Sequence, residues 1–174
     1  MIQNGQKEKN EQKEKIVNKY KFDELIKRGS FGVVFKGYHI FTNEPVAIKI
    51  ENPSISKSLK HETRILNYLY LNNVRSIPSI YWYGLYGELP CLIIPYYLYS
   101  LKTYFERINK KTENLQNPDK IDSNISKIIL QIIDILKHIH SHFIIHRDLK
   151  PDNFMINTQG NIILIDFGLA TFYI

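Results

Sequence analysis

Short runs of hydrophobic and β-branched residues, separated by turn residues, fill the chain from residue 20 to residue 51. The runs are "YKFDELIKRG", "VVFKGYHIF" and "VAIKIE", and the last two are divided by the turn "TNEP". Such runs predict strands, and the short connections between them favour antiparallel pairing. The pattern therefore predicts a three-stranded antiparallel sheet at the start of the folded chain.

The next segment, "SKSLKHETRILNYLYL", has the spacing of a helix. Leu59, Leu66 and Leu69 fall on one helical face, and Glu62 lies on that same face. A carboxylate in an apolar stripe is costly to bury unless it has a partner of opposite charge. We therefore expect a buried cation near Glu62.

Two further strand-like runs, "IPSIYWYG" and "LPCLIIP", follow this helix and are split by a turn at residues 86–88. They bring the predicted sheet to five strands. Ser100 is placed to cap a short helix that reaches about Arg107. The stretch "NKKTENLQNPDK" then predicts a polar loop.

A long helix is predicted from Ser123 to Phe143, and its apolar face is wide. The apolar residues with helical spacing are Ile125, Ile128, Ile129, Ile132, Leu136 and Ile139, and Leu130, Ile133 and Ile135 widen the face. Such a helix requires burial on several sides. The chain ends in the strand-like pieces "FMIN" and "IILID", joined by the turn "TQGN".

Composition limits the class of protein. The 23 Lys and Arg exceed the 17 Asp and Glu, giving a net charge of +6, but no basic stripe with interleaved aromatics predicts nucleic-acid binding beyond a nucleotide. The single cysteine, Cys91, excludes an internal disulfide framework and indicates a reducing compartment. No apolar run is long enough to span a membrane and no signal region is visible, so we expect an intracellular protein, cytoplasmic or nuclear.

A first group of residues suits the binding of a phosphate. In "IKRGSFGVVFKG", Gly29 and Gly32 allow backbone amides to approach an anion without obstruction by side chains. Lys49, in the strand "VAIK", lies among apolar neighbours, where an ammonium group needs an anion, although a Lys at the surface can also extend to water. Glu62 of the helix offers that anion.

A second group is more specific. "HRDLKPDN" places Asp148, Lys150 and Asn153 within six residues, and Asp166 of "DFG" follows thirteen residues later. Asp148 can accept a hydroxyl proton and Lys150 can neutralise a moving phosphoryl group, while Asn153 and Asp166 offer hard oxygens to Mg²⁺. This set suits phosphoryl transfer, which depends mainly on positioning and charge neutralisation. The histidines at 138, 140, 142 and 146 do not share a helix face, which argues against zinc.

With these motifs in this order the chain resembles the protein kinases. Lys150, two residues after Asp148, resembles the serine/threonine type, and finer features resemble the casein kinase 1 branch. Those features are "GSFGVVFKG", "EPVAIKIE", "SIPSIYWYG", "IHSHFIIHRDLKPDNFMI" and "LIDFGLA", and the likeness runs from about Tyr20 to Ala170. It implies a two-lobed α+β fold, with a five-stranded antiparallel N-lobe that carries one helix and an incomplete, mostly helical C-lobe. It also implies a protein that uses ATP and Mg²⁺ and acts on Ser or Thr of a protein substrate, with no membrane partner.

The resemblance also implies roles for single residues. Asp148, Lys150, Lys49 and Glu62 would be catalytic, and Asn153 and Asp166 would hold the metal. His146 and Arg147 would be structural. The nucleotide would contact Ile26, Gly29, Ser30, Phe31, Gly32, Val34, Ala47, Lys49, Ile94, Pro95, Tyr97 and Met155. Among these, Ile26, Val34 and Ala47 would lie above the adenine, and Met155 would lie below it. Ile94 would be the gatekeeper, Pro95 would offer a carbonyl to the adenine, and the backbone N–H of Tyr97 would donate to the ring.

The chain departs from the family pattern at three positions. Lys27 stands where the first loop glycine is usual, so we expect less easy closure of the loop or weaker ATP binding. Thr171 and Phe172 replace the basic residues that this branch has after "DFGLA", so a preference for acidic or phosphorylated substrates cannot be carried over.

The family pattern also includes an activation segment, a peptide-binding platform and a buried helix, which this sequence lacks. We therefore interpret the chain as truncated: a charged, flexible tail at 1–18, an N-lobe at 19–94 and a partial helical C-lobe at 95–174 with the hinge, catalytic loop and "DFG". The long helix would leave an apolar face uncovered, which predicts marginal stability and aggregation or a partner there. The alternatives are a nucleotide-binding module without catalysis and an interaction protein made by truncation.

Overall fold

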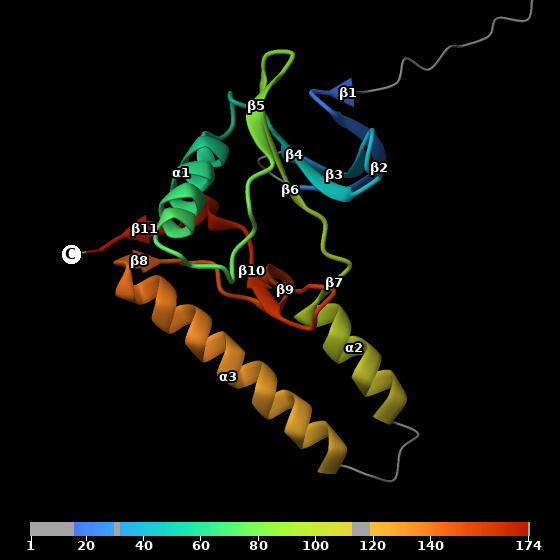
Figure 1. The fold of residues 1–174 in the computed structure, drawn as a ribbon, viewed down its shortest axis with the longest axis vertical. Coiled ribbons are helices and arrows are strands. Elements are labelled where there is room, and N and C mark those ends of the chain that lie inside the picture. Colours follow the sequence, from blue (N-terminus) through green and yellow to red (C-terminus); the bar gives the residue numbers. More distant parts are fainter. Residues whose placement is uncertain (1–15, 30–31, 113–118, 174) are drawn as a thin grey trace, which may run out of the picture.

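The computed structural model describes residues 16–29, 32–112 and 119–173. Figure 1 shows an antiparallel sheet with one helix beside it, and a second part built of helices and short strands. This arrangement is the α+β fold that the resemblance to the protein kinases implies.

The sheet has six strands in the order β1-β2-β3-β4-β6-β5, and every neighbouring pair is antiparallel. The strands are β1 (Ile16–Val17), β2 (Tyr20–Arg28), β3 (Gly32–His39), β4 (Pro45–Glu51), β5 (Trp82–Tyr86) and β6 (Leu89–Pro95). Five of them confirm the prediction, although β5 begins later than the run "IPSIYWYG" indicated.

The sixth strand, β1, corrects the predicted tail. Residues 1–15 lie outside the described residues, but Ile16 and Val17 pair with Lys21 and Tyr20 of β2. The Val17 side chain is only 5% exposed and packs in the core of the sheet with Val46 and Ile48. Two adjacent apolar residues at the end of a polar segment therefore suffice to extend the sheet, because the partner strand begins three residues later.

Helix α1 (Ser58–Leu71) packs on the other face of the sheet. Its buried Leu59 contacts Leu92 and Ile94 of β6. Further along, Leu66 and Leu69 belong to a separate core that extends into the second part of the molecule. The helix therefore contacts both parts (Figure 1), and Glu62 lies along it between Leu59 and Leu66.

The second part surrounds the segment that holds the predicted catalytic residues. Its elements are β7 (Tyr99–Ser100), α2 (Leu101–Thr112), α3 (Asp119–Ser141), β8 (Ile144–Ile145), η1 (Pro151–Asn153), β9 (Phe154–Ile156), β10 (Ile162–Leu164), η2 (Phe167–Leu169) and β11 (Thr171–Phe172). The Ser100 hydroxyl accepts a hydrogen bond from the N–H of Thr103, as predicted for a cap, but α2 runs five residues beyond Arg107. Residues 113–118 of the polar loop lie outside the described residues.

Helix α3 has one buried face and one exposed face. Ile128, Ile135 and Ile139 pack in the core with Phe154 and Leu164, and Ile139 is fully buried. On the other side Ile129, Leu130 and Ile133 are 50%, 62% and 53% exposed. This group of three, the α3 apolar patch, confirms that part of the wide hydrophobic face has no cover within the described residues. None of the described helices is long and apolar enough to cross a membrane.

We expect the double substitution Leu130→Lys/Ile133→Lys to reduce self-association of the 174-residue chain and its binding of an apolar dye. The change removes exposed apolar area and breaks no buried contact, so the free energy of unfolding should stay within about 0.5 kcal/mol. Sedimentation velocity and urea denaturation measure the two effects. The control is Ile139→Ala, which should cost about 2–5 kcal/mol because it opens a cavity in the core. Unchanged self-association of the double variant would contradict the prediction.

Candidate active site

A buried ion pair joins the sheet to α1. Ile48 and Ile50 of β4 turn into the sheet core, so the alternation of the strand directs Lys49 to the opposite face, towards α1. The Lys49 Nζ lies 2.6 Å from the Glu62 Oε1, and the Glu62 side chain is only 3% exposed. Burial lowers the pKa of Lys49, but the carboxylates of Glu62 and Asp166 outweigh this effect and hold the pKa above its ordinary value. The pairing predicted for these two residues is confirmed.

A second buried carboxylate, Glu51, holds the first turn of α1. Its Oε1 accepts hydrogen bonds from the backbone N–H of Ser58 at 2.7 Å, from the Ser58 hydroxyl at 2.7 Å and from the N–H of Leu59 at 3.1 Å. Residue Lys57, at the N-cap position, makes no capping hydrogen bond with its side chain. Glu51 therefore satisfies the free N–H groups of the helix from a neighbouring strand.

Sequence reasoning missed this role of Glu51. The available signal was an acid at the end of an apolar strand, seven residues before the first residue of a helix that has no acid in its first turn. Because the contact is between two elements, local capping rules do not reveal it.

The segment after β8 brings Asp148, Lys150 and Asn153 together. The Lys150 Nζ donates to the Asp148 Oδ2 at 2.6 Å, and the Asn153 Nδ2 donates to the same oxygen at 3.0 Å and to the Asp148 carbonyl at 2.8 Å. The hydrogen bond from Lys150 lowers the pKa of Asp148, and the same contact raises the pKa of Lys150. Asp148 is therefore held as a carboxylate whose position is fixed from two sides.

His146 and Arg147 fix the "DFG" segment. The His146 Nε2 lies 3.0 Å from the Ile165 carbonyl, and its ring meets that of Phe167 edge-on at 4.7 Å. Burial lowers the pKa of His146, so the ring is held neutral, with Nε2–H as donor to the carbonyl. Arg147 donates from Nε to the Leu169 carbonyl at 2.6 Å. These contacts agree with structural roles for the two residues.

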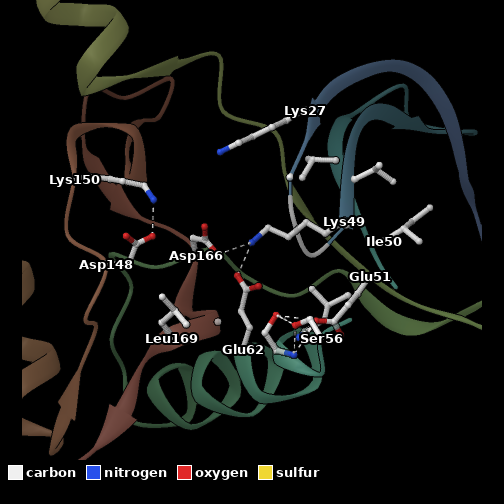
Figure 2. A pocket seen from close by; sticks show the side chains of 17 residues that line it. Lys27, Lys49, Ile50, Glu51, Ser56, Glu62, Asp148, Lys150, Asp166 and Leu169 are labelled. Carbon is white, nitrogen blue, oxygen red and sulfur yellow. Dashed lines mark hydrogen bonds and ion pairs between the residues drawn. The ribbon is translucent and has the colours of Figure 1, made fainter. Parts of the chain in front are cut away.

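Asp166 has a left-handed backbone, with φ 69° and ψ 64°, which a non-glycine residue adopts only when its surroundings impose it. The neighbouring Phe167 is fully buried in the core shared with Leu66 and Leu69 of α1. Burial of Phe167 turns the Asp166 carboxylate in the other direction, where its Oδ1 lies 3.8 Å from the Lys49 Nζ (Figure 2).

These groups line one open cavity of about 500 Å³, within the range of small-molecule sites. Figure 2 shows Lys49 and Glu62 on one side and Asp148 with Lys150 on the other, with Asp166 between them. The lining residues are Lys27, Gly29, Gly32, Val33, Val34, Lys49, Ile50, Glu51, Ser56, Ser58, Leu59, Glu62, Asp148, Lys150, Asp166, Gly168 and Leu169. A Cβ at Gly32 would lie 2.2 Å from the Ile50 carbonyl, so only glycine fits at this turn into β3.

Of the residues predicted to hold adenine, Val34 lines this cavity and the others do not. Ala47 pairs directly with Ile94 across β4 and β6, and Ile94 is buried with Leu59 and Leu92. Ile26, Pro95, Tyr97 and Met155 do not line the cavity either, and Ser30 and Phe31 lie outside the described residues. Within the described part of the chain the backbone N–H of Tyr97 has no acceptor, which leaves it available to a ligand. The structure thus brings together the predicted phosphate-handling residues and leaves the adenine contacts as predictions.

Asn153 and Asp166, the predicted metal ligands, carry oxygens of the kind that a hard divalent cation prefers, and only Asp166 lines the cavity. Asn153 uses its Nδ2 for Asp148, so its Oδ1 remains without a partner in the described structure. Asp166 offers a second oxygen from a side chain that is 46% exposed. Mg²⁺ is usually held by one or two protein oxygens together with phosphates and water. The part of the chain that the structure describes contains no group of three or more His, Cys, Asp or Glu side chains suited to a metal.

Comparison with known proteins agrees with this geometry. Residues 20–174 match the family model described as "Protein kinase domain". The chain is 34% identical over 159 residues to casein kinase I homolog 1 of Saccharomyces cerevisiae, which covers 88% of this chain and 28% of that protein. It is 34% identical to casein kinase I homolog RAG8 of Kluyveromyces lactis, and 30% identical to casein kinase I homolog 3 of Schizosaccharomyces pombe, again over 88% of this chain. The chain spans 28% of the length of the RAG8 protein and 34% of the Schizosaccharomyces pombe protein.

We expect Lys49→Met to lower the free energy of unfolding by about 3–5 kcal/mol, because it leaves the Glu62 carboxylate buried without a cation. The double substitution Lys49→Met/Glu62→Leu should recover most of this loss, since no unpaired charge remains. Urea denaturation measures both, and Lys60→Met, at an exposed position of α1, is the matched control. A single variant as stable as the unsubstituted chain would rule out a buried pair.

We expect Glu51→Gln to lower the free energy of unfolding by about 1–3 kcal/mol, because an amide offers one acceptor oxygen and presents an N–H₂ to the donors of α1. Amide hydrogen exchange should accelerate in the first turn of α1 before it does in the sheet. Glu88→Gln, in the exposed turn between β5 and β6, is the control. Equal exchange at Ser58 and Leu59 in both variants would show that Glu51 does not hold the helix.

Proposed function

The chain belongs to the protein kinase family, and we propose that it contains the nucleotide-binding and phosphoryl-transfer centre of a casein kinase I-like serine/threonine kinase. The observation that carries this proposal is the convergence of Lys49, Glu62, Asp148, Lys150 and Asp166 on one cavity. Each charged group has an opposite charge nearby, so the site is preorganised to accept a polyphosphate and a cation without large rearrangement.

MgATP would supply the phosphoryl group when bound. The Asp148 carboxylate would accept the proton of the attacking hydroxyl, and its lowered pKa keeps it ionised near neutral pH. Lys150, now paired with Asp148, would turn its positive charge to the phosphoryl group as the proton is taken up. Lys49, held by Glu62, would bind the phosphates nearer the sheet, and Asn153 and Asp166 would hold Mg²⁺.

The choice of acceptor and of compartment also belongs to this proposal. A hydroxyl of Ser or Thr is the proposed acceptor because Lys150 follows the serine/threonine pattern. Cys91 is fully buried and burial raises the pKa of its thiol to about 12, which suits a reducing, intracellular location.

A nucleotide-binding module without catalysis is the competing function. Such a module would lose the base or the metal-binding carboxylate, yet Asp148 and Asp166 are both present and both line the cavity. An interaction protein would use the α3 apolar patch, whose three side chains are exposed.

We expect Asp148→Asn to lower phosphate transfer to casein, or to the chain itself, by about 10²–10⁴-fold, while the affinity for MgATP stays within about twofold. The reason is that the amide cannot accept the hydroxyl proton but still holds the neighbouring side chains. Transfer of labelled phosphate and calorimetric titration measure the two quantities. Asp152→Asn, in the same loop but paired with Lys102 outside the cavity, is the matched control. Binding of MgATP without any transfer by the unsubstituted chain would favour the non-catalytic module.

A further inference from the structure

Two irregularities in the pairing of β2 with β3 decide where Lys27 points. Phe22 pairs with Gly37, Leu25 with Phe35, and Lys27 with Val34, with register shifts between these pairs. Each shift places an extra residue in β2, and a bulge of this kind redirects the side chains that follow it. The second shift falls at Ile26, so Lys27 lies directly opposite Val34.

Lys27, Val34 and Lys49 therefore form one row across three strands. Val34 of β3 pairs with Lys27 on one side and with Lys49 of β4 on the other. Directly paired residues of antiparallel strands project from the same face of a sheet. All three line the cavity, and Figure 2 shows the Lys27 amino group extending across it towards the side of Lys150.

The ammonium group of Lys27 is the only one in this cavity that has no carboxylate partner among the described residues. Lys49 is paired with Glu62 and Asp166, and Lys150 is paired with Asp148. The remaining lining carboxylate, Glu51, is engaged with the N-terminus of α1. Lys27 thus adds a positive charge that no lining carboxylate offsets, at the point where the phosphates would lie.

We propose that Lys27 binds the polyphosphate of the nucleotide directly, as a third cation opposite Lys150, and so strengthens ATP binding. This inference rests on the proposed function. It reverses the expectation, drawn from the missing glycine, that Lys27 weakens binding. The Lys27 side chain points into the cavity, so it offers its positive charge to the ligand. The register shift at Ile26 lets β2 depart from regular pairing although no glycine stands at position 27.

The test compares Lys27→Met with Arg28→Met by calorimetric titration of MgATP, MgADP and adenosine. Arg28 is the matched control because its substitution removes the same charge one residue later, at a position that does not line the cavity. We expect Lys27→Met to weaken MgATP binding roughly tenfold, MgADP binding by less and adenosine binding by less than twofold. Arg28→Met should leave all three affinities within about twofold. The difference between the Lys27 variant and the unsubstituted chain should shrink at 0.5 M salt, roughly three times the physiological ionic strength, because salt screens exposed charges.

An affinity of Lys27→Met for MgATP equal to or higher than that of the unsubstituted chain would overturn this inference alone. An equal loss for adenosine and MgATP would also overturn it, because it would place the effect outside the phosphates. If the unsubstituted chain binds neither MgATP nor adenosine, the proposed function is overturned, and the inference with it. Lys27→Gln, which keeps a polar side chain of similar length, repeats the test, and unfolding temperatures without nucleotide verify that all variants are folded.

Discussion

The ion pair between Lys49 and Glu62 is the contact on which the site depends. It is buried, so each charge would be costly without the other, and this mutual need fixes the distance between β4 and α1. Hydrophobic packing of Leu59 on β6 would tolerate small displacements of the helix, whereas a contact of 2.6 Å between two charges does not. The pair therefore fixes the position of the Lys49 ammonium group more narrowly than the packing of α1 on the sheet would.

The position of α1 is also determined by contacts at its other turns. Glu51 holds its first turn, and His61 reaches from Nε2 to the Ala170 carbonyl at 2.7 Å. The "DFG" segment packs closely against the start of α1, because a Cβ added to Gly168 would lie 3.3 Å from the Ser58 Cβ. Strand β4, helix α1 and the "DFG" segment consequently form one connected unit. A displacement of α1 would separate Lys49 from Glu62 and disturb the placement of Asp166 in the same motion.

The sequence predicts most of the elements and the buried pair of Lys49 with Glu62, because both depend on local spacing and on the cost of burying charge. The alternation in "VAIKIE" is enough to separate Lys49 from the sheet core, and the apolar stripe of α1 isolates Glu62. Three features of the structure could not be predicted from the sequence. Strand β1 and the contact of Glu51 with α1 arise between elements, and the direction of Lys27 depends on two register shifts that no residue type marks.

The two sides of the cavity have different electrostatic character, and this difference bears on how a ligand would be oriented. On the helical side Lys150 is paired with Asp148. On the sheet side Lys49 is paired with Glu62 and with Asp166, while Lys27 has no carboxylate partner among the described residues. Positive charge is therefore in excess near the strands, and free carboxylate oxygens lie nearer Asp148 and Asp166. A phosphate chain would settle against the sheet, and a cation or a hydroxyl against the catalytic loop. This polarity follows from where each side chain has a partner, and it gives the site a direction before any ligand arrives.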